Sequence, residues 1–328
     1  MYTIRCFDKI RKHEAESIWS VFYPTYRKMA DIINFDTDGT RPEIEKFFQS
    51  KIGKDFRDRL KRPSVSPNQD FFAAIFHETL IGCALIEPEP EIERIILKIY
   101  VLPDFRELGY GSLLLKKTLK RGKDLKASKV HVNVDAYNKA ARGFLAKHGF
   151  KRIRCFLDME VKLDRVQIRK FLSNDITVLN LEPGQEKKLA AIQNRVFTGS
   201  WGFCPNTSRD IEYFLYLTSS RLQDVLILKK KGNPFGYFWS HSVSPHRVNG
   251  ECRVRRARIH MFGLEKDLRS RGNGYILLSL GLNDLRKKEV DFVGLTVDSL
   301  NHPAVNLYKK FGFRTIKRKY WYELVLNY

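Results

Sequence analysis

The sequence is poor in the features that mark secreted, metal-binding and membrane proteins. Its five cysteines are scattered over 328 residues and never form a Cys-x-x-Cys pair. This spacing argues against both a disulfide framework and a zinc site. No apolar stretch approaches the ~18 residues of a membrane helix, and the first residues lack a secretory hydrophobic run. We therefore predict a reduced, cytoplasmic protein with no metal and no membrane association.

Acidic residues are scarce relative to basic ones. The chain has 37 Asp and Glu against 59 Lys and Arg, a net charge of +22 that is spread over both halves. Such a field favours anionic partners, namely nucleotide phosphates, nucleic acid or acidic proteins. A generally Lys-rich, solvated surface gives the same count, so charge alone leaves both interpretations open.

The common phosphate-binding fingerprints are also missing. No Walker sequence occurs, and the dinucleotide pattern Gly-x-Gly-x-x-Gly fails because Leu114 and Leu277 stand at its third glycine. What the chain has instead is a duplication. Arg106, Gly111, Asn138 and Phe150 recur 163 positions later as Arg269, Gly274, Asn301 and Phe313. A constant separation of half the chain predicts two copies of one unit. We place them at residues 1–163 and 175–328, with a linker at 164–174.

Hydrophobic periodicity predicts a similar order of strands and helices in each copy. In the first copy we expect strands at Thr3–Phe7, Phe71–Phe76, Leu80–Ile86, Arg94–Val101, Val130–Val134 and Lys151–Lys162, and helices near 15–26, 44–48, 109–125 and 139–147. In the second we expect strands at Ile176–Leu181, Val225–Leu228, Phe235–Val243, Arg253–Leu264, Val290–Val297 and Thr315–Val325, and helices near 189–197, 211–215, 274–285 and 303–311. This order is typical of a mixed α/β fold with at least one parallel crossover.

In each copy a glycine turn opens a helix, so that free N–H groups and the helix dipole can meet a phosphate. Arg106–Gly111 and Arg269–Gly274 both read Arg-x-x-Gly-x-Gly. This pattern resembles the cofactor motif of the GNAT family of acetyl-CoA-dependent N-acetyltransferases. The likeness takes in nearly all the chain, and its layout resembles tandem members such as mycothiol synthase. It implies two tandem GNAT domains, each with a mixed, splayed sheet flanked by helices.

The resemblance also implies how acetyl-CoA is bound. In the second copy Leu264 would contact the pantetheine arm through its backbone, and Asn301 would hydrogen-bond the same arm. The backbone amides that would hold the pyrophosphate belong to Arg269, Ser270, Arg271, Gly272, Asn273 and Gly274. In the first copy the corresponding candidates are Val101, Arg106, Gly109, Gly111 and Asn138.

The copies differ where chemistry is expected. By the resemblance, Tyr308 would protonate the departing CoA thiolate, whereas the first copy has Leu145 at that position. His260, whose counterpart at the same separation is Leu97, is the candidate base for the amine. The alternatives are a core aromatic for Tyr308, and a core cap or carboxylate partner for His260.

Three further residues bear on the acceptor. Arg258, two residues before His260, has a side chain suited to an anionic acceptor. Trp201 and Phe203 are candidates for an acceptor pocket or for simple packing. The predicted function is transfer of an acetyl group to a primary amine, with chemistry in the second copy and a degenerate or regulatory first copy. The alternative is a CoA-sensing or RNA-associated binding protein that uses basic stretches such as Lys229–Lys231 and Arg253–Arg258.

Overall fold

The computed structural model describes residues 31–34, 42–76, 79–168, 176–248 and 252–327. The chain divides into two compact units, which are described separately. Unit 1 comprises residues 1–130 and 325–328, and unit 2 comprises residues 131–324. The predicted strand Thr3–Phe7 and the predicted helix near 15–26 lie outside the described residues, as does most of the predicted linker.

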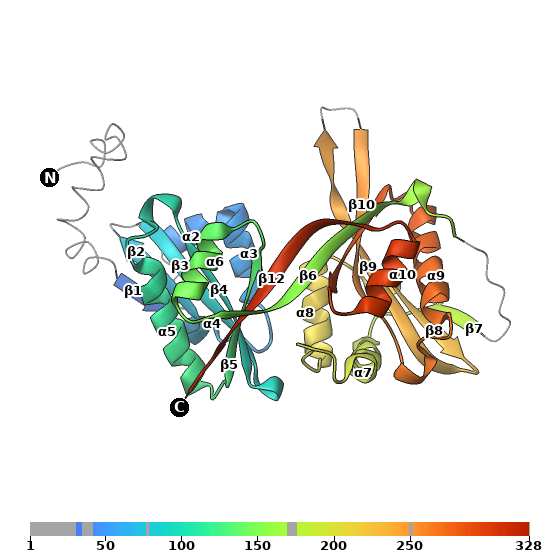
Figure 1. The fold of residues 1–328 in the computed structure, drawn as a ribbon, viewed down its shortest axis with the longest axis horizontal. Helices are drawn as coiled ribbons and strands as arrows, with labels where there is room; N and C mark the ends of the chain where they lie inside the picture. Colours follow the sequence, from blue (N-terminus) through green and yellow to red (C-terminus); the bar gives the residue numbers. More distant parts are fainter. Residues whose placement is uncertain (1–30, 35–41, 77–78, 169–175, 249–251, 328) are drawn as a thin grey trace. The chain divides into compact units, whose positions relative to one another are not determined.

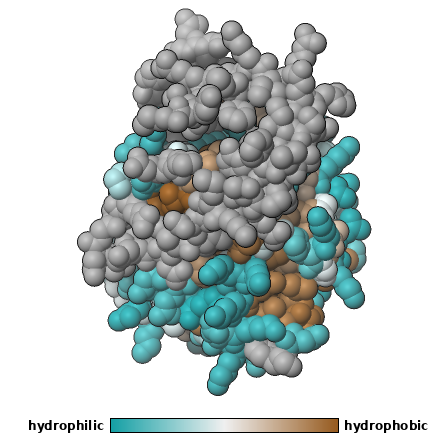
Figure 2. Space-filling view, turned by 90° about the vertical axis from the view of Figure 1, so that its left-hand side faces the viewer, coloured by the Kyte–Doolittle hydropathy of each residue, from teal (hydrophilic) through white to brown (hydrophobic). Residues whose placement is uncertain are grey.

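Unit 1 is built on an antiparallel sheet of four strands in the order β1-β2-β3-β4. Its elements are β1 Asp31–Asn34, α2 Pro42–Gln49, α3 Lys51–Arg59, α4 Pro67–Asp70, β2 Phe71–Phe76, β3 Thr79–Glu89, β4 Arg94–Val101 and α5 Tyr110–Asp124. Apart from Thr79, every residue of β3 is buried, because α5 packs on one face and α2 and α3 on the other. Figure 2 shows one side of the molecule, where hydrophilic side chains surround smaller hydrophobic areas.

Unit 2 contains a larger mixed sheet in the order β12-β6-β11-β10-β9-β8-β7. Its neighbours are antiparallel except for β10 and β11, which are parallel. The chain enters this unit within β5 Lys129–Asp135. The other elements are α6 Lys139–Lys147, β6 Lys151–Lys162, β7 Ile176–Asn180, α7 Glu186–Phe197, α8 Ser208–Thr218, β8 Val225–Lys230, β9 Asn233–Val248, β10 Cys252–Leu264, α9 Asn273–Lys287, β11 Phe292–Asp298, α10 His302–Lys310 and β12 Arg314–Val325.

Four helices of unit 2, α7, α8, α9 and α10, are labelled in Figure 1, and they pack in two separate cores. Residues of α9 and α10 pack with Ala257 and Ile259 of β10 on one face. Residues of α7 and α8 pack with Tyr237 and Trp239 of β9 on the other. The α8 helix begins at Ser208, earlier than the predicted 211–215, because Thr207 and Asp210 cap it reciprocally.

One strand of unit 2 comes from the first copy of the duplicated sequence. β6 ends at Lys162, yet it pairs with β11 on one side and with β12 on the other. It therefore separates two strands that both belong to the second copy. The division into copies at 1–163, 164–174 and 175–328 describes the sequence duplication and stays a prediction about domains.

The mixed α/β class and the order of elements follow the sequence prediction. The strand Arg94–Val101 and the helix Lys139–Lys147 have the predicted bounds. Three described strands and α-helices were not predicted, namely β1, α3 and α4. The α3 helix lacks a clear apolar stripe, because only Gly53 and Phe56 of its residues are buried while most of the others are charged.

Candidate active site

The two glycine turns have the same backbone conformation. The second residue of each motif is left-handed, with φ of 64° at Glu107 and 61° at Ser270. The fourth residue is a left-handed glycine that caps the following helix, Gly109 in α5 and Gly272 in α9. A left-handed non-glycine residue costs about 1–2 kcal/mol. Both copies have a strained residue at the same position of the motif. The shape of the turn is therefore shared by the two copies.

The motif arginine fixes this turn to the end of the preceding strand. Arg269 donates from Nε to the carbonyl oxygen of Leu264 over 2.9 Å, and Arg106 donates to that of Val101 over 3.2 Å. Arg269 also donates from Nη2 to the carbonyl of Val196, at the end of α7, over 2.6 Å. The guanidinium is thus engaged with backbone carbonyls, and its part in the site is to shape the turn.

The turn in unit 2 suits a pyrophosphate. The first N–H groups of α9 have no acceptor within the helix, and they add to the positive end of its dipole. A Cβ built on Gly272 meets no atom within 4 Å, whereas one on Gly274 lies 3.3 Å from Leu307. The carboxamide nitrogen of Asn273 donates to the carbonyl of Leu268 over 2.9 Å, which orders the turn. Arg271 is exposed beside it.

The two predicted asparagines are helix N-caps. Asn301 accepts from the N–H of Ala304 over 3.2 Å, and Asn138 accepts from that of Ala141 over 3.0 Å. Both side chains are exposed, and each cap uses the amide oxygen, which leaves the NH₂ group as a donor for a ligand. Of the first-copy candidates, Val101, Arg106, Gly109 and Gly111 lie in unit 1, and Asn138 lies in unit 2.

The ladder between β10 and β11 is short. Only Arg256, Ala257 and Arg258 pair with β11, and the last pair joins Arg258 to Gly294. Both strands continue past this point, β10 to Leu264 and β11 to Asp298. The two strands therefore separate after Arg258, which is the splay that the sequence resemblance predicts.

A β-bulge lies at the same level of β10. Ile259 pairs with Ser240 and Met261 with Trp239, so His260 is an extra residue in the ladder. Bulges re-aim side chains and are frequent next to active sites. Here the bulge directs His260 and Met261 to the same side of the sheet, whereas Ile259 packs with α9 and α10.

Unit 1 has no bulge at this level of β4. The β9–β10 ladder ends with the pair Leu264–Gly236, and the β3–β4 ladder ends with the pair Val101–Gly82. Counted back from these pairs, the residues of the two ladders correspond one to one as far as Met261 and Lys98. The next pair in unit 1 is Leu97–Ile86, whereas in unit 2 it is Ile259–Ser240. Leu97 is therefore the counterpart of Ile259, and the sequence-based pairing of Leu97 with His260 is wrong. A constant separation in sequence cannot reveal one inserted residue within a strand.

Two histidines lie together beside the bulge. The ring centroid of His260 is 4.4 Å from that of Trp239, 5.7 Å from Phe214 and 6.1 Å from His241. Burial, with smaller contributions from His241 and the cation of Arg258, lowers the pKa of His260 to about 3. Burial and then Arg258 lower the pKa of His241 to about 4. Both imidazoles are consequently neutral at pH 7. His241 was missed in the sequence because only strand pairing brings it here.

Tyr308 belongs to the core and also lies near the end of the splayed strand. It is 6% exposed, and its ring lies 6.1 Å from that of Phe262 on β10 and 5.7 Å from that of Phe313. Burial raises the pKa of its hydroxyl, which stays protonated at any ordinary pH. Leu145, at the corresponding place in α6, is buried and has no polar atom on its side chain.

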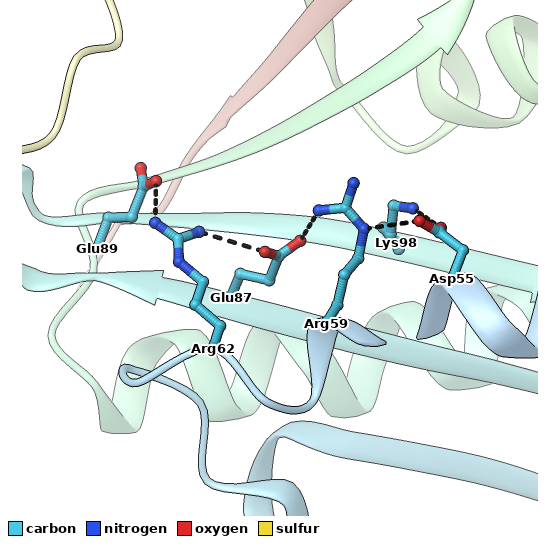
Figure 3. Close-up of polar contacts among 6 residues, drawn as sticks. All are labelled: Asp55, Arg59, Arg62, Glu87, Glu89 and Lys98. Atoms are coloured by element: carbon cyan, nitrogen blue, oxygen red, sulfur yellow. Dashed lines mark hydrogen bonds and ion pairs between the residues drawn. The ribbon is translucent and has the colours of Figure 1, made fainter. Parts of the chain in front are cut away.

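In unit 1 the position that corresponds to His241 has an ion-paired residue instead of a histidine. The same count along β3 and β9 makes Glu87 the counterpart of His241. Glu87 is 2% exposed and binds Arg59 and Arg62 over 2.7 and 3.3 Å. Figure 3 shows these contacts as part of a chain that runs through Glu89, Arg62, Glu87, Arg59, Asp55 and Lys98.

The predicted acceptor residues are divided between two clusters. Trp201 stacks on His131 at 5.4 Å and contacts Phe156 and Trp321 at 5.9 Å. Phe203 packs against Phe197 of α7 at 5.5 Å. A role for either residue in binding an acceptor stays a prediction. Arg258, in contrast, has well-defined polar partners. It donates from Nη2 to Asp158 over 3.0 Å and to the hydroxyl of Thr296.

The duplicated motif is matched by a family model. The model of the acetyltransferase (GNAT) family matches residues 29–150 and again residues 187–313. The chain belongs to the GNAT family. Because the two matched ranges together cover most of the chain, both copies are GNAT units, and the protein is an N-acetyltransferase with tandem architecture.

Relatives with the same layout are known. A mycothiol acetyltransferase of Acidothermus cellulolyticus is 24% identical over 247 residues, which span 72% of this chain and 73% of that protein. One of Thermobispora bispora is 26% identical over 243 residues, with 72% and 77% covered.

Solved structures agree on the fold. A GCN5-related N-acetyltransferase from Sphaerobacter thermophilus has a TM-score of 0.61 and 19% identity over 84% of each chain. A tandem GNAT protein from the clavulanic acid biosynthesis pathway has a TM-score of 0.62 and 13% identity, over 90% of this chain and 98% of that one. At these identities the likeness concerns the fold alone.

GNAT enzymes take their acetyl group from acetyl-CoA. The first N–H groups of α9 and the NH₂ group of Asn301 are hydrogen-bond donors of the kind that such a cofactor needs. Among the described residues, no group of three or more His, Cys, Asp or Glu side chains is arranged to hold a metal ion. In the same part of the chain, no helix is long and apolar enough to cross a membrane.

Proposed function

We propose that this GNAT protein transfers an acetyl group from acetyl-CoA to a primary amine, and that the reaction takes place in the second copy. The supporting observation is the coincidence of three features of β10. The ladder to β11 ends at Arg258, the bulge places an extra residue at His260, and Tyr308 lies against Phe262 just beyond. Unit 1 has a continuous β3–β4 ladder at this level, and Leu145 takes the place of Tyr308.

The cofactor would bind along the turn that opens α9. The backbone N–H groups of residues 269–274 would hold the pyrophosphate, Leu264 and Asn301 would contact the pantetheine arm, and the gap between β10 and β11 would admit it. Acetyl-CoA supplies the acetyl group as a thioester. The backbone at the bulge offers an N–H for the charge that develops on the carbonyl oxygen.

The proton steps belong to two side chains. His260 would accept the proton of the attacking amine as the N–C bond forms, and its low pKa means that it releases the proton to water instead of keeping it. Tyr308 would give its proton to the departing thiolate as the C–S bond breaks. The raised pKa of Tyr308 keeps that proton in place until then.

The first copy would bind cofactor or serve a structural role without catalysing transfer. Its turn has the same left-handed residues and the same arginine contact as the second. Binding through such a turn depends on backbone geometry, whereas turnover needs the bulged histidine and the tyrosine. We therefore assign Val101, Arg106, Gly109 and Gly111 of unit 1 to a second cofactor-binding turn that lacks chemistry, and a cofactor contact of Asn138 stays a prediction from the sequence.

The test is an amine panel in which CoA release is followed with the full-length chain. The wild type should release CoA only when an amine is present. Tyr308→Phe should lower kcat by about 10²–10⁴, the usual contribution of a general acid, with the melting temperature little changed. Gly109→Ala in the first copy is the matched control and should keep full turnover. If Tyr308→Phe turns over like the wild type across the pH range, the assigned acid is wrong.

The alternative of an RNA-binding protein receives little support from its basic stretch. Arg255, Arg256 and Arg258 are each ion-paired, with Glu289, Glu160 and Asp158 respectively. Paired arginines offer less positive field to a phosphate backbone than the sequence suggests. This alternative would be supported if the protein binds RNA and the affinity falls steeply between about 50 and 200 mM salt, as counterion release predicts.

A further inference from the structure

A group of charged and polar side chains lies on one side of the sheet of unit 2, next to the histidine pair. We call it the charged floor, and it consists of Asp158 and Glu160 on β6, Arg256 and Arg258 on β10, Thr296 on β11 and Lys319 on β12. Its four longer members are 23–37% exposed, so solvent and ligands reach them.

Strand register explains why these residues share a face. Gly294 pairs with Arg258 on one side and with Glu160 on the other, while Thr296 pairs with Asp158. Gly294 has no side chain, and the nearest atom to a Cβ built there is Nη1 of Arg258, 3.5 Å away. The missing side chain at Gly294 therefore leaves room for the guanidinium of Arg258.

Asp158 contacts three other members of the charged floor. It is 9% exposed and accepts hydrogen bonds from Arg258 over 3.0 Å and from Thr296, and Lys319 lies 3.2 Å away. Burial raises the pKa of Asp158, but these donors outweigh it and the pKa is lowered overall. The carboxylate is thus charged, and Arg258, Thr296 and Lys319 take three of its roughly four acceptor sites, so its main part is to hold these neighbours in place.

The charges around Asp158 do not cancel. Arg256 pairs with Glu160 one to one, whereas two cations, Arg258 and Lys319, share the single carboxylate of Asp158. One positive charge is left over beside the place where β10 leaves β11. Within the described residues both hydrogen bonds of Arg258 run through Nη2, which leaves Nη1, next to Gly294, and Nε as donors for a ligand.

We propose that Arg258 binds an anionic group of the acceptor, so that the substrate is a primary amine that also carries a carboxylate or a phosphate. This rests on the proposed function above. The anion would bind the guanidinium of Arg258 next to Gly294, and the amine of the same substrate would lie toward His260, the next residue but one along β10. The amine nitrogen forms the new N–C bond, the C–S bond breaks, the amine proton goes to His260, and the thiolate takes the proton of Tyr308.

In this arrangement Asp158 is a positioning residue. It touches no reacting atom, and it holds the guanidinium of Arg258 from the side opposite the ligand. Because Asp158 lies on β6, the first copy of the sequence supplies part of the acceptor site of the second.

The experiment compares matched amines with the full-length chain. Phenylalanine is set against phenethylamine, and O-phosphoethanolamine against ethanolamine, so that the two pairs separate carboxylate from phosphate. In the wild type at least one acidic amine should have the higher kcat/KM. Arg258→Met should lower that acidic-to-neutral ratio on the order of 10- to 100-fold, as expected for loss of a hydrogen-bonded ion pair. Comparing ratios between variants cancels the different basicities of the amines.

Arg255→Met is the control for charge. Arg255 is on the same strand but pairs with Glu289, away from the floor, so its removal should leave the ratio unchanged. Asp158→Asn should raise KM for the acidic amine with kcat nearly constant, and should leave the neutral amine unaffected. A merely structural role would instead lower the rates with both amines alike.

A measurement on the wild type covers the case in which Arg258→Met fails to fold. 3-Phenylpropionate, which lacks the amine, should inhibit competitively against the acceptor, whereas 3-phenylpropanol should not. Equal use of acidic and neutral amines, together with equal inhibition by both compounds, overturns the proposal. Acetylation of no amine at all defeats the proposed function itself, which is a different and distinguishable outcome.

Discussion

Asp158 accepts a hydrogen bond from Arg258 over 3.0 Å, although the two residues come from different copies of the duplicated sequence. The contact exists because β6 lies between β11 and β12 in the sheet. The second copy therefore does not form its sheet alone, because the sheet of unit 2 includes a strand that precedes residue 164. This arrangement has direct consequences for truncation.

A chain that begins at residue 164 is expected not to fold stably. Removing β6 would leave both β11 and β12 without a neighbour on that side, and the polar floor would lose Asp158 and Glu160. Circular dichroism and thermal unfolding of the fragment should show no cooperative transition, while a fragment that begins at residue 131 and ends at residue 328 should recover one. Cooperative unfolding of the 164–328 fragment alone would contradict the importance of β6.

The two motif arginines should differ in their effect on stability. Arg269→Ala removes two hydrogen bonds, to Leu264 and Val196, whereas Arg106→Ala removes one, to Val101. At about 1 kcal/mol for each bond, the free energy of unfolding should fall roughly twice as much for Arg269→Ala. Denaturant titration measures this difference. Binding of acetyl-CoA to the second copy, followed by calorimetry, should weaken in parallel because the turn loses its anchor. Equal effects of the two substitutions would show that the Val196 contact contributes nothing.

The histidine pair should make stability fall at mildly acid pH. Burial lowers the pKa of His260 to about 3, from about 6.5 in an unfolded chain. Between these values the unfolded state binds more protons, so stability is complete above pH 6.5 and is lost as pH falls toward 3. At pH 4.5 the loss due to His260 is about 2–3 kcal/mol.

His260→Gln isolates this effect, because glutamine keeps polar atoms but does not titrate. Urea unfolding measures the free energy of unfolding at pH 7 and pH 4.5, and this free energy should fall less for the variant than for the wild type. Titration of the carboxylates contributes equally to both proteins. An unchanged drop would mean that His260 titrates normally in the folded protein.

Breaking the ion-pair chain of unit 1 should be costly. Glu87→Ala would leave Arg59 and Arg62 without their shared carboxylate in a largely buried place, and removal of one partner from a buried pair costs about 3–5 kcal/mol. Lys162→Ala is the control, because its pair with Asp164 is exposed, and such pairs contribute about 0–1 kcal/mol. Thermal unfolding of both variants decides the comparison. If Glu87→Ala and Lys162→Ala lose similar stability, the ion pairs of Glu87 are exposed to solvent.

Much of the local structure follows from the sequence. The apolar run Phe71–Phe76 predicts a strand with the observed bounds, because a strand buried on both faces is apolar throughout. The strand Arg94–Val101 also has the predicted bounds, although it is partly buried and includes Arg94 and Lys98. The glycine turns and the N-cap asparagines are predictable for a similar reason, since their geometry depends on a few neighbouring residues. Comparison of the two copies also singles out Tyr308 and His260 as residues that only the second has.

The sequence by itself determined the family, the duplication and the turn that opens each cofactor helix, because these are local patterns repeated at a fixed separation. Only the tertiary structure decided which strands are neighbours. Strand pairing brings His241 beside His260, inserts β6 next to β11, and places the carboxylate of Asp158 under the guanidinium of Arg258. It also shows that His260 is an inserted residue, since a bulge is defined by the partner strand. Each of these relationships joins residues that no periodicity along a single strand connects.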